Sequence, residues 1–148
     1  MKALLRGSAD IIAMEDSELD FVLAQITNRD EDGRTLLWIA AANGHTNVAS
    51  IIVSAGADVN TQRNDGSSAL GIASQEGYID IVHMFLDKDV QTETRDNLGR
   101  TPLWFAAANG QTDVVRALSA AGADVNTQHY DGISMHLISV AGRDTLTL

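Results

Sequence analysis

The sequence predicts an all-α fold in which similar helix-turn-helix units, joined by extended hairpin fingers, stack into a solenoid. Two observations predict it. Residues 30–62 and 96–128 agree at most positions without a gap, and both end in the phrase AGADVNTQ. A fixed repeat period is typical of architectures in which each unit packs on its neighbours. The period is 33 residues, marked by Gly33, Gly66, Gly99 and Gly132.

The first helix of each unit is expected to begin at a hydroxyl residue two positions after these glycines. Serine and threonine side chains accept hydrogen bonds from the otherwise unpaired N–H groups at a helix start. Pro102 follows one of them, at the position where proline is favoured because it lacks an N–H. A second set of glycines ends the short apolar run, as glycine commonly ends helices. The hydroxyl residues are Thr35, Ser68, Thr101 and Ser134, and the closing glycines are Gly44, Gly77 and Gly110.

A second helix is predicted in each unit, directly after the closing glycine. Apolar residues recur at i, i+1 and i+3 or i+4 within 48–52, 81–86 and 114–118. This spacing gives a helix with one buried face. An extended loop with the sequence AGADVNTQ follows at 55–62 and again at 121–128.

The order turn, helix, turn, helix, extended loop resembles an ankyrin-repeat protein. The family pattern is D-x-x-G-x-T-P-L-x-x-A-A-x-x-G, ending in G-A-D-V-N, and the resemblance covers residues 30–141. It implies a solenoid that acts as a non-enzymatic protein–protein interaction module or scaffold. The matching residues are Asp96, Gly99, Thr101, Pro102, Leu103, Ala106, Ala107, Gly110, Gly122, Ala123, Asp124, Val125 and Asn126.

The sequence departs from the family pattern at two kinds of position. The family usually has histidine where this chain has Trp38, Gly71 and Trp104. Asp89 also replaces the glycine of the extended loop, although aspartate tolerates the left-handed conformation better than most residues. We therefore expect residues 63–95 to be a degenerate repeat.

On this interpretation, residues 1–148 form a single ankyrin-repeat domain. Its parts are N-terminal capping helices (1–29), a first repeat (30–62), a degenerate second repeat (63–95), a third repeat (96–128) and a truncated C-terminal repeat (129–148). The truncation is expected to leave apolar surface uncovered, and so to favour either weak homo-oligomerisation through the C-terminal face or a frayed tail. It also favours an alternative function, as the scaffold or regulatory segment of a larger protein whose activity lies outside this chain.

Composition argues against several function classes. The chain has no cysteine, which excludes disulfides and thiolate chemistry. Its net charge of −10 is unlike that of proteins that bind phosphate backbones or anionic lipids through clustered Lys and Arg. No apolar run approaches the length of a membrane-spanning helix. We therefore expect a cytoplasmic, or otherwise intracellular, protein that binds neither nucleic acid nor a membrane.

The sequence indicates no catalytic chemistry. It contains no G-x-S-x-G, no H-E-x-x-H and no phosphate-cradling glycine loop. The histidines do not have the spacing of a compact zinc site. The acidic stretch EDSELD at 15–20 lacks the alternating ligands and central glycine of a calcium loop. We therefore expect no enzyme activity, no cofactor and no metal.

The resemblance implies that a protein partner contacts the finger tips and the concave surface of the first helices. Leu98, Tyr130 and Ile133 are apolar at finger positions that are polar in the first two repeats. Tyr130 and Ile133 either cover the truncated last unit or contact the partner. The candidate protein-binding residues are Arg34, Gln62, Arg95, Leu98, Arg100, Trp104, Asn109, Tyr130 and Ile133.

Some of these residues also have a structural interpretation. Trp38 and Trp104 either pack between units or serve as exposed anchors, since tryptophan is enriched among binding hot spots. The finger arginines either bind partner carboxylates through two hydrogen bonds or pair with neighbouring acids such as Asp32 and Asp96.

Overall fold

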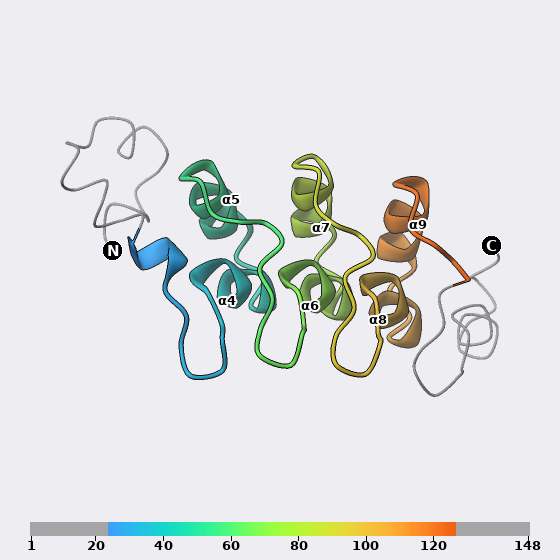
Figure 1. Cartoon of the computed structure of the whole chain (residues 1–148). Helices are drawn as coiled ribbons and strands as arrows, with labels where there is room; N and C mark the ends of the chain where they lie inside the picture. The colour runs from blue at the N-terminus through green and yellow to red at the C-terminus, as the bar shows by residue number, and fades with distance from the viewer. Residues whose placement is uncertain (1–23, 127–148) are drawn as a thin grey trace.

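The computed structural model describes residues 24–126, in which short helices alternate with hairpin loops (Figure 1). Residues 24–27 are helical and lead into the first hairpin. The helices that follow are α4 (Leu36–Ala42), α5 (Thr46–Ser54), α6 (Ala69–Glu76), α7 (Ile79–Leu86), α8 (Pro102–Ala108) and α9 (Thr112–Ala120).

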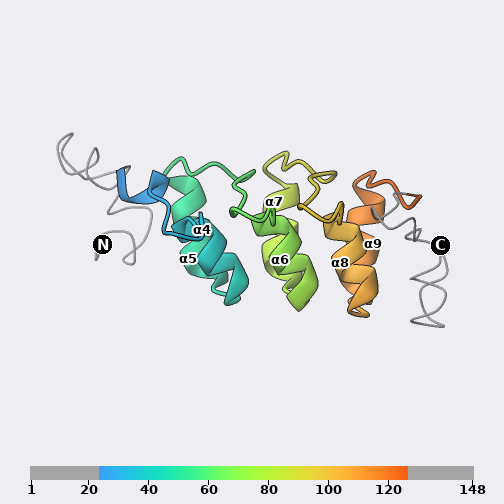
Figure 2. The ribbon, with the colours of Figure 1, turned by 60° about the horizontal axis from the view of Figure 1, so that its bottom comes forward.

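The helices form two layers. An inner layer of α4, α6 and α8 lies side by side, and α5, α7 and α9 form an outer layer behind it (Figures 1 and 2). Each inner helix packs on the outer helix of its own unit, and α6 packs on the inner helices on both sides, α4 and α8. Only residues 43–45 separate α4 from α5, a loop length typical of antiparallel helix pairs. The all-α solenoid predicted from the repeat is thereby confirmed.

The hydroxyl residues start the inner helices as predicted. The Oγ1 atoms of Thr35 and Thr101 accept the backbone N–H of the residue three positions on, in both cases at 3.2 Å. Ser68 does the same for Gly71 at 2.8 Å. Each cap stabilises its helix by about 1 kcal/mol, because it satisfies a donor that the helix itself leaves unpaired.

The core is one continuous layer between the helices. Alanines of the inner helices, such as Ala41 and Ala106, are fully buried, and their small size lets neighbouring helices approach closely. Larger residues of the outer helices, such as Phe85 and Leu118, fill the space behind them. No unit encloses its apolar residues alone, so each depends on the next for its stability.

The degenerate second unit keeps the fold of its neighbours. Asp89 has φ 55°, a left-handed conformation, and it stands where the other two units have Gly56 and Gly122. A non-glycine residue with positive φ costs about 1 kcal/mol or more, so this loop is retained at some cost in stability.

The hairpins form three fingers, which we define as the first (30–34), second (63–67) and third (96–100). Each is closed by a backbone hydrogen bond between its end residues, for example from Asp96 N–H to the Arg100 carbonyl at 3.0 Å. Adjacent fingers are also bonded to each other. Asn64 N–H donates to the Asp32 carbonyl and Asn97 N–H to the Asp65 carbonyl, both at 2.8 Å. The fingers therefore form a ladder along one edge of the solenoid.

Within residues 24–126, no helix is long and apolar enough to cross a membrane.

Candidate functional site

The inner helices present an almost uncharged surface, which we call the inner-helix face. Its residues follow the i, i+3, i+4 spacing of one helix side. Ile39 is its most exposed large apolar residue, at 36%. Glu76 is the only charged residue in α4, α6 and α8. The exposed or half-buried residues of this face are Ile39, Ala42, Asn43, Ile72, Gln75, Glu76, Ala108 and Asn109.

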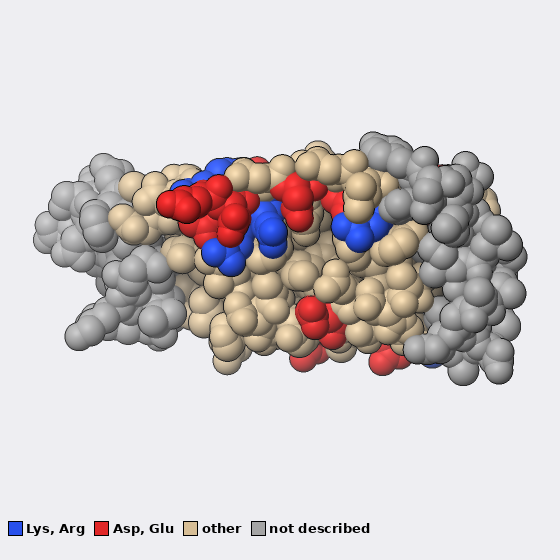
Figure 3. Space-filling view, turned by 90° about the horizontal axis from the view of Figure 1, so that it is seen from below, with Lys and Arg blue, Asp and Glu red and all other residues tan. Residues whose placement is uncertain are grey.

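The fingers border this face with a row of charged side chains (Figure 3). In the first finger, Arg34 contacts two carboxylates: its Nε lies 2.7 Å from Asp30 Oδ2 and its Nη2 lies 3.5 Å from Asp32 Oδ2. The pKa of Asp30 lies below its ordinary value, chiefly because its carboxylate accepts the backbone N–H of Arg34. Arg34 thus pairs with neighbouring acids, which is one of the two interpretations that the sequence allowed.

The third finger repeats this arrangement in a more buried form. Asp96 is only 6% exposed, and its Oδ1 accepts the backbone N–H groups of Leu98 and Arg100. Both Nε and Nη2 of Arg100 lie 2.7 Å from Asp96 Oδ2. The guanidinium also lies over the rings of Trp104, at 5.5 Å, and Phe105, at 4.8 Å. Arg100 is therefore held in one place from two sides.

Trp38 is packed between units. It is buried, and its Nε1 donates to the Ser67 carbonyl of the second finger at 3.1 Å. The guanidinium of Arg63 lies 5.3 Å from the centre of its ring. The packing interpretation thus holds for Trp38. Trp104 is half-buried and forms an edge-to-face contact with Phe105 at 5.6 Å.

Three of the predicted site residues make hydrogen bonds to the local backbone. Gln62 Nε2 donates to the Gly66 carbonyl at 2.7 Å and to the Arg95 carbonyl at 3.4 Å, which links two units. Arg95 Nη1 donates to the Gly99 carbonyl at 3.3 Å. Asn109 Nδ2 donates to the Phe105 carbonyl at the end of α8, at 2.7 Å. These side chains support the fingers and the helix end.

Leu98 is the most exposed large apolar residue between 24 and 126, at 52%. It occupies the tip of the third finger, where the first two fingers have Asp32 and Asp65. Its backbone N–H is bonded to Asp96 at 3.0 Å, so the turn does not depend on its side chain. Tyr130 and Ile133, also predicted from the sequence, lie outside the described residues.

Ile39 and Phe105 were not among the site residues predicted from the sequence. These residues are 66 positions apart, in the same register as Ile72 of the second unit. A Cβ at Gly71 would lie 3.7 Å from the Phe105 ring, an ordinary contact distance, so Gly71 lies directly against this ring. Alignment of the three units by their period would have shown that Ile39, Ile72 and Phe105 share one position.

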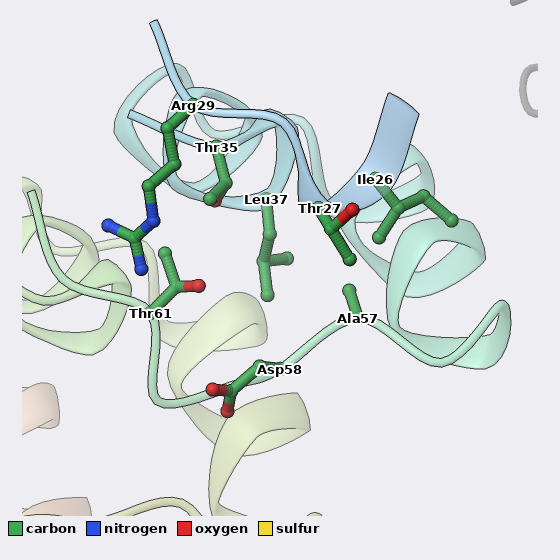
Figure 4. A pocket seen from close by; sticks show the side chains of 8 residues that line it. All are labelled: Ile26, Thr27, Arg29, Thr35, Leu37, Ala57, Asp58 and Thr61. Carbon is green, nitrogen blue, oxygen red and sulfur yellow. The ribbon is translucent and has the colours of Figure 1, made fainter. Parts of the chain in front are cut away.

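A cavity of ≈ 180 Å³ lies at the N-terminal end of the described chain (Figure 4). Its polar groups serve the local backbone: Asp58 Oδ1 accepts the Asn60 N–H at 2.9 Å, and Arg29 Nη1 donates to the Gly33 carbonyl at 3.1 Å. We assign no chemistry to it. Across residues 24–126, His, Asp and Glu side chains form no cluster of three with the geometry of a metal site. The residues that line the cavity are Ile26, Thr27, Arg29, Thr35, Leu37, Ala57, Asp58 and Thr61.

Comparison with known proteins agrees with the architecture. A family model described as ankyrin repeats (3 copies) matches residues 1–96 and 55–129. No curated protein matches the chain. The family match spans most of the chain and coincides with the stacked helix pairs and fingers described above. The chain therefore belongs to the ankyrin-repeat family.

Proposed function

We propose that this chain is a protein-interaction module that binds a protein partner on the inner-helix face and the adjoining fingers. Ankyrin repeats are generally protein–protein interaction modules. The specific support in this chain is the inner-helix face, which exposes Ile39 and carries Glu76 as its only charge. Desolvation of such a surface costs little, so a partner gains affinity from apolar burial.

The layout of the surface also supports binding on this side. The hydrogen bonds that cap the inner helices are made by hydroxyl residues at the same position of each described unit, such as Thr35 and Thr101. Ile39 and Leu98 are the exposed large apolar residues between 24 and 126, at 36% and 52%, and their side chains close no turn and cap no helix. A partner that covers them removes apolar surface from water, which favours association.

The proposal is tested by placing a charge on the inner-helix face. The immobilised full chain is incubated with an extract of cells that express it, and bound proteins are identified by mass spectrometry. Ile39→Asp is expected to reduce recovery of a specific partner at least about tenfold, because the new carboxylate would be desolvated in the complex.

Ser50→Asp is the matched control. It adds the same charge at an exposed position of α5, in the outer layer. It is expected to leave recovery unchanged, and circular dichroism should show both variants folded. Loss of the partner with Ser50→Asp, but not with Ile39→Asp, would place binding on the other layer. If the wild-type chain retains no specific protein, the proposed function itself is wrong.

A further inference from the structure

The three fingers differ in charge although they share one backbone turn. The first finger has one base and three acids, and the second and third fingers have one base and one acid each. The first two fingers carry an acid at the tip position, Asp32 and Asp65, whereas the third carries Leu98 there. The third finger is therefore the one of these three whose tip places no carboxylate against an acidic group.

The arginine of the first finger contacts two acids, and the third finger lacks the second of these acids. Arg34 contacts the carboxylates of both Asp30 and Asp32. Among the described residues, the equivalent Arg100 contacts the carboxylate of Asp96 alone, because Leu98 occupies the position of Asp32. The second finger also has an acid at this position, Asp65, which lies 3.8 Å from Arg63 Nη2. Only the third finger combines an arginine with an apolar tip.

Arg100 is well suited to bind an outside carboxylate. A guanidinium has five N–H donors, and Asp96 contacts only the Nε and Nη2 atoms. The side chain is still 29% exposed, and the rings of Trp104 and Phe105 fix its position. Little side-chain entropy is lost when a group already held in this way binds a ligand.

We propose that the third finger binds a partner segment in which a carboxylate adjoins a large apolar side chain. This inference rests on the proposed function. The carboxylate pairs with Arg100, in the role that Asp32 has beside Arg34. The apolar side chain packs on Leu98 and is thereby removed from water. The partner is thus a peptide segment with an acidic residue next to leucine, isoleucine, phenylalanine or a similar residue.

The test uses a displayed library of random dodecapeptides, selected on the full-length chain. Enriched peptides are expected to contain an Asp or Glu within two positions of a large apolar residue. Each is then synthesised together with its amide counterpart, Asp→Asn or Glu→Gln. The Kd of the amide form, and the Kd of the acidic form for Leu98→Asp, are each expected to rise at least about tenfold. Leu98→Asp restores the first-finger arrangement and places a carboxylate against that of the peptide.

Two control variants separate the contributions. Leu98→Ala removes apolar surface without adding charge, so it should weaken binding less than Leu98→Asp does. Ser50→Asp adds the same charge on the outer layer, and binding should not change. Leu98→Asp should also leave the urea midpoint of unfolding unchanged, since the side chain is 52% exposed. A large fall in that midpoint would mean that Leu98 packs within the chain, and would refute the inference.

The outcomes distinguish this inference from the proposed function. Peptides that bind the wild-type chain and Leu98→Asp equally, but lose binding with Ile39→Asp, refute the third-finger inference and support the inner-helix face. Enriched peptides without carboxylates also refute the inference. If no peptide binds above background and no protein is retained from the extract, both proposals fail.

Discussion

Replacement of Gly66 by alanine should be one of the most damaging single-methyl changes in the chain. Gly66 has φ 83°, and a Cβ built on it would lie 2.8 Å from Asp96 Cα and 3.1 Å from Asn97 N, which are main-chain atoms of the next finger. A flexible side chain could move away from the new methyl group, but this backbone cannot. It is held there by the hydrogen bond from Asn97 N–H to the Asp65 carbonyl, at 2.8 Å.

Gly56 provides a control in which only the backbone strain is present. Its φ is 101°, and a Cβ there would meet no atom within 4 Å. Gly56→Ala should therefore cost about 1–2 kcal/mol of unfolding free energy, from the left-handed conformation alone. Gly66→Ala should lose that amount and a further ~1–3 kcal/mol for the overpacked contact. The difference between the two variants isolates the contact between fingers.

The assay is equilibrium urea unfolding followed by circular dichroism, with tryptophan fluorescence as a second probe. The two probes should report one transition for Gly56→Ala. For Gly66→Ala, a lower m-value or non-coincident transitions are expected, because weaker coupling between units reduces cooperativity in a repeat protein. If Gly66→Ala costs no more than Gly56→Ala and unfolds as cooperatively, the fingers do not pack as described.

Three further predictions concern single residues. Ser74→Ala should raise the unfolding free energy by about 1 kcal/mol, measured by urea unfolding. The buried Ser74 Oγ makes no hydrogen bond within the described residues, and the other units have alanine at this position. A loss of stability would contradict this prediction. Asp89→Gly should stabilise the chain by up to about 1 kcal/mol in the same assay, by relieving the strain at φ 55°, whereas a decrease would show that the Asp89 side chain is needed. Asp30 should titrate below the ordinary aspartate pKa in a carboxyl ¹³C NMR experiment, since its carboxylate accepts the Arg34 N–H. The pKa of Asp30 is lower in the folded state than in the unfolded state. The stability that Asp30 contributes is therefore complete above its unfolded pKa and is lost as the pH falls through its folded pKa. A titration midpoint at or above the ordinary aspartate value would refute this prediction.

The fold could be predicted from the sequence because its determinants are local and repeated. Thr35, Ser68 and Thr101 cap helices through contacts three residues away, and the 33-residue period shows them three times in the described chain. The register also placed Asp89 at a glycine position of the extended loop but did not decide its conformation, which is left-handed. Local capping and the apolar spacing thus sufficed to give the helix pairs and their order.

The candidate site was harder to predict because its contacts join different units. The role of Trp38 depends on the Ser67 carbonyl, 29 residues away, and that of Gln62 on the Arg95 carbonyl, 33 residues away. No local pattern distinguishes a tryptophan that faces a partner from one that faces the next finger. Gln62 and Asn109 were predicted as contact residues from their position alone, without any sign that they also bond the backbone.

The differences between units say more about recognition than their agreement does. Positions that agree, such as Thr35 and Thr101, perform the same structural task in each unit. Some differences lie against one another within the stack, as Gly71 and Phe105 do. The difference between Asp32 in the first finger and Leu98 in the third is of another kind, because nothing in the described chain compensates for it. The turn is the same in both fingers, but the third lacks the ion pair of Asp32 and exposes an apolar side chain instead. We propose that this change, which removes a local ion pair and exposes an apolar side chain, serves the contact with a partner. The third finger, and not the tryptophans, therefore joins the inner-helix face in the proposed binding surface.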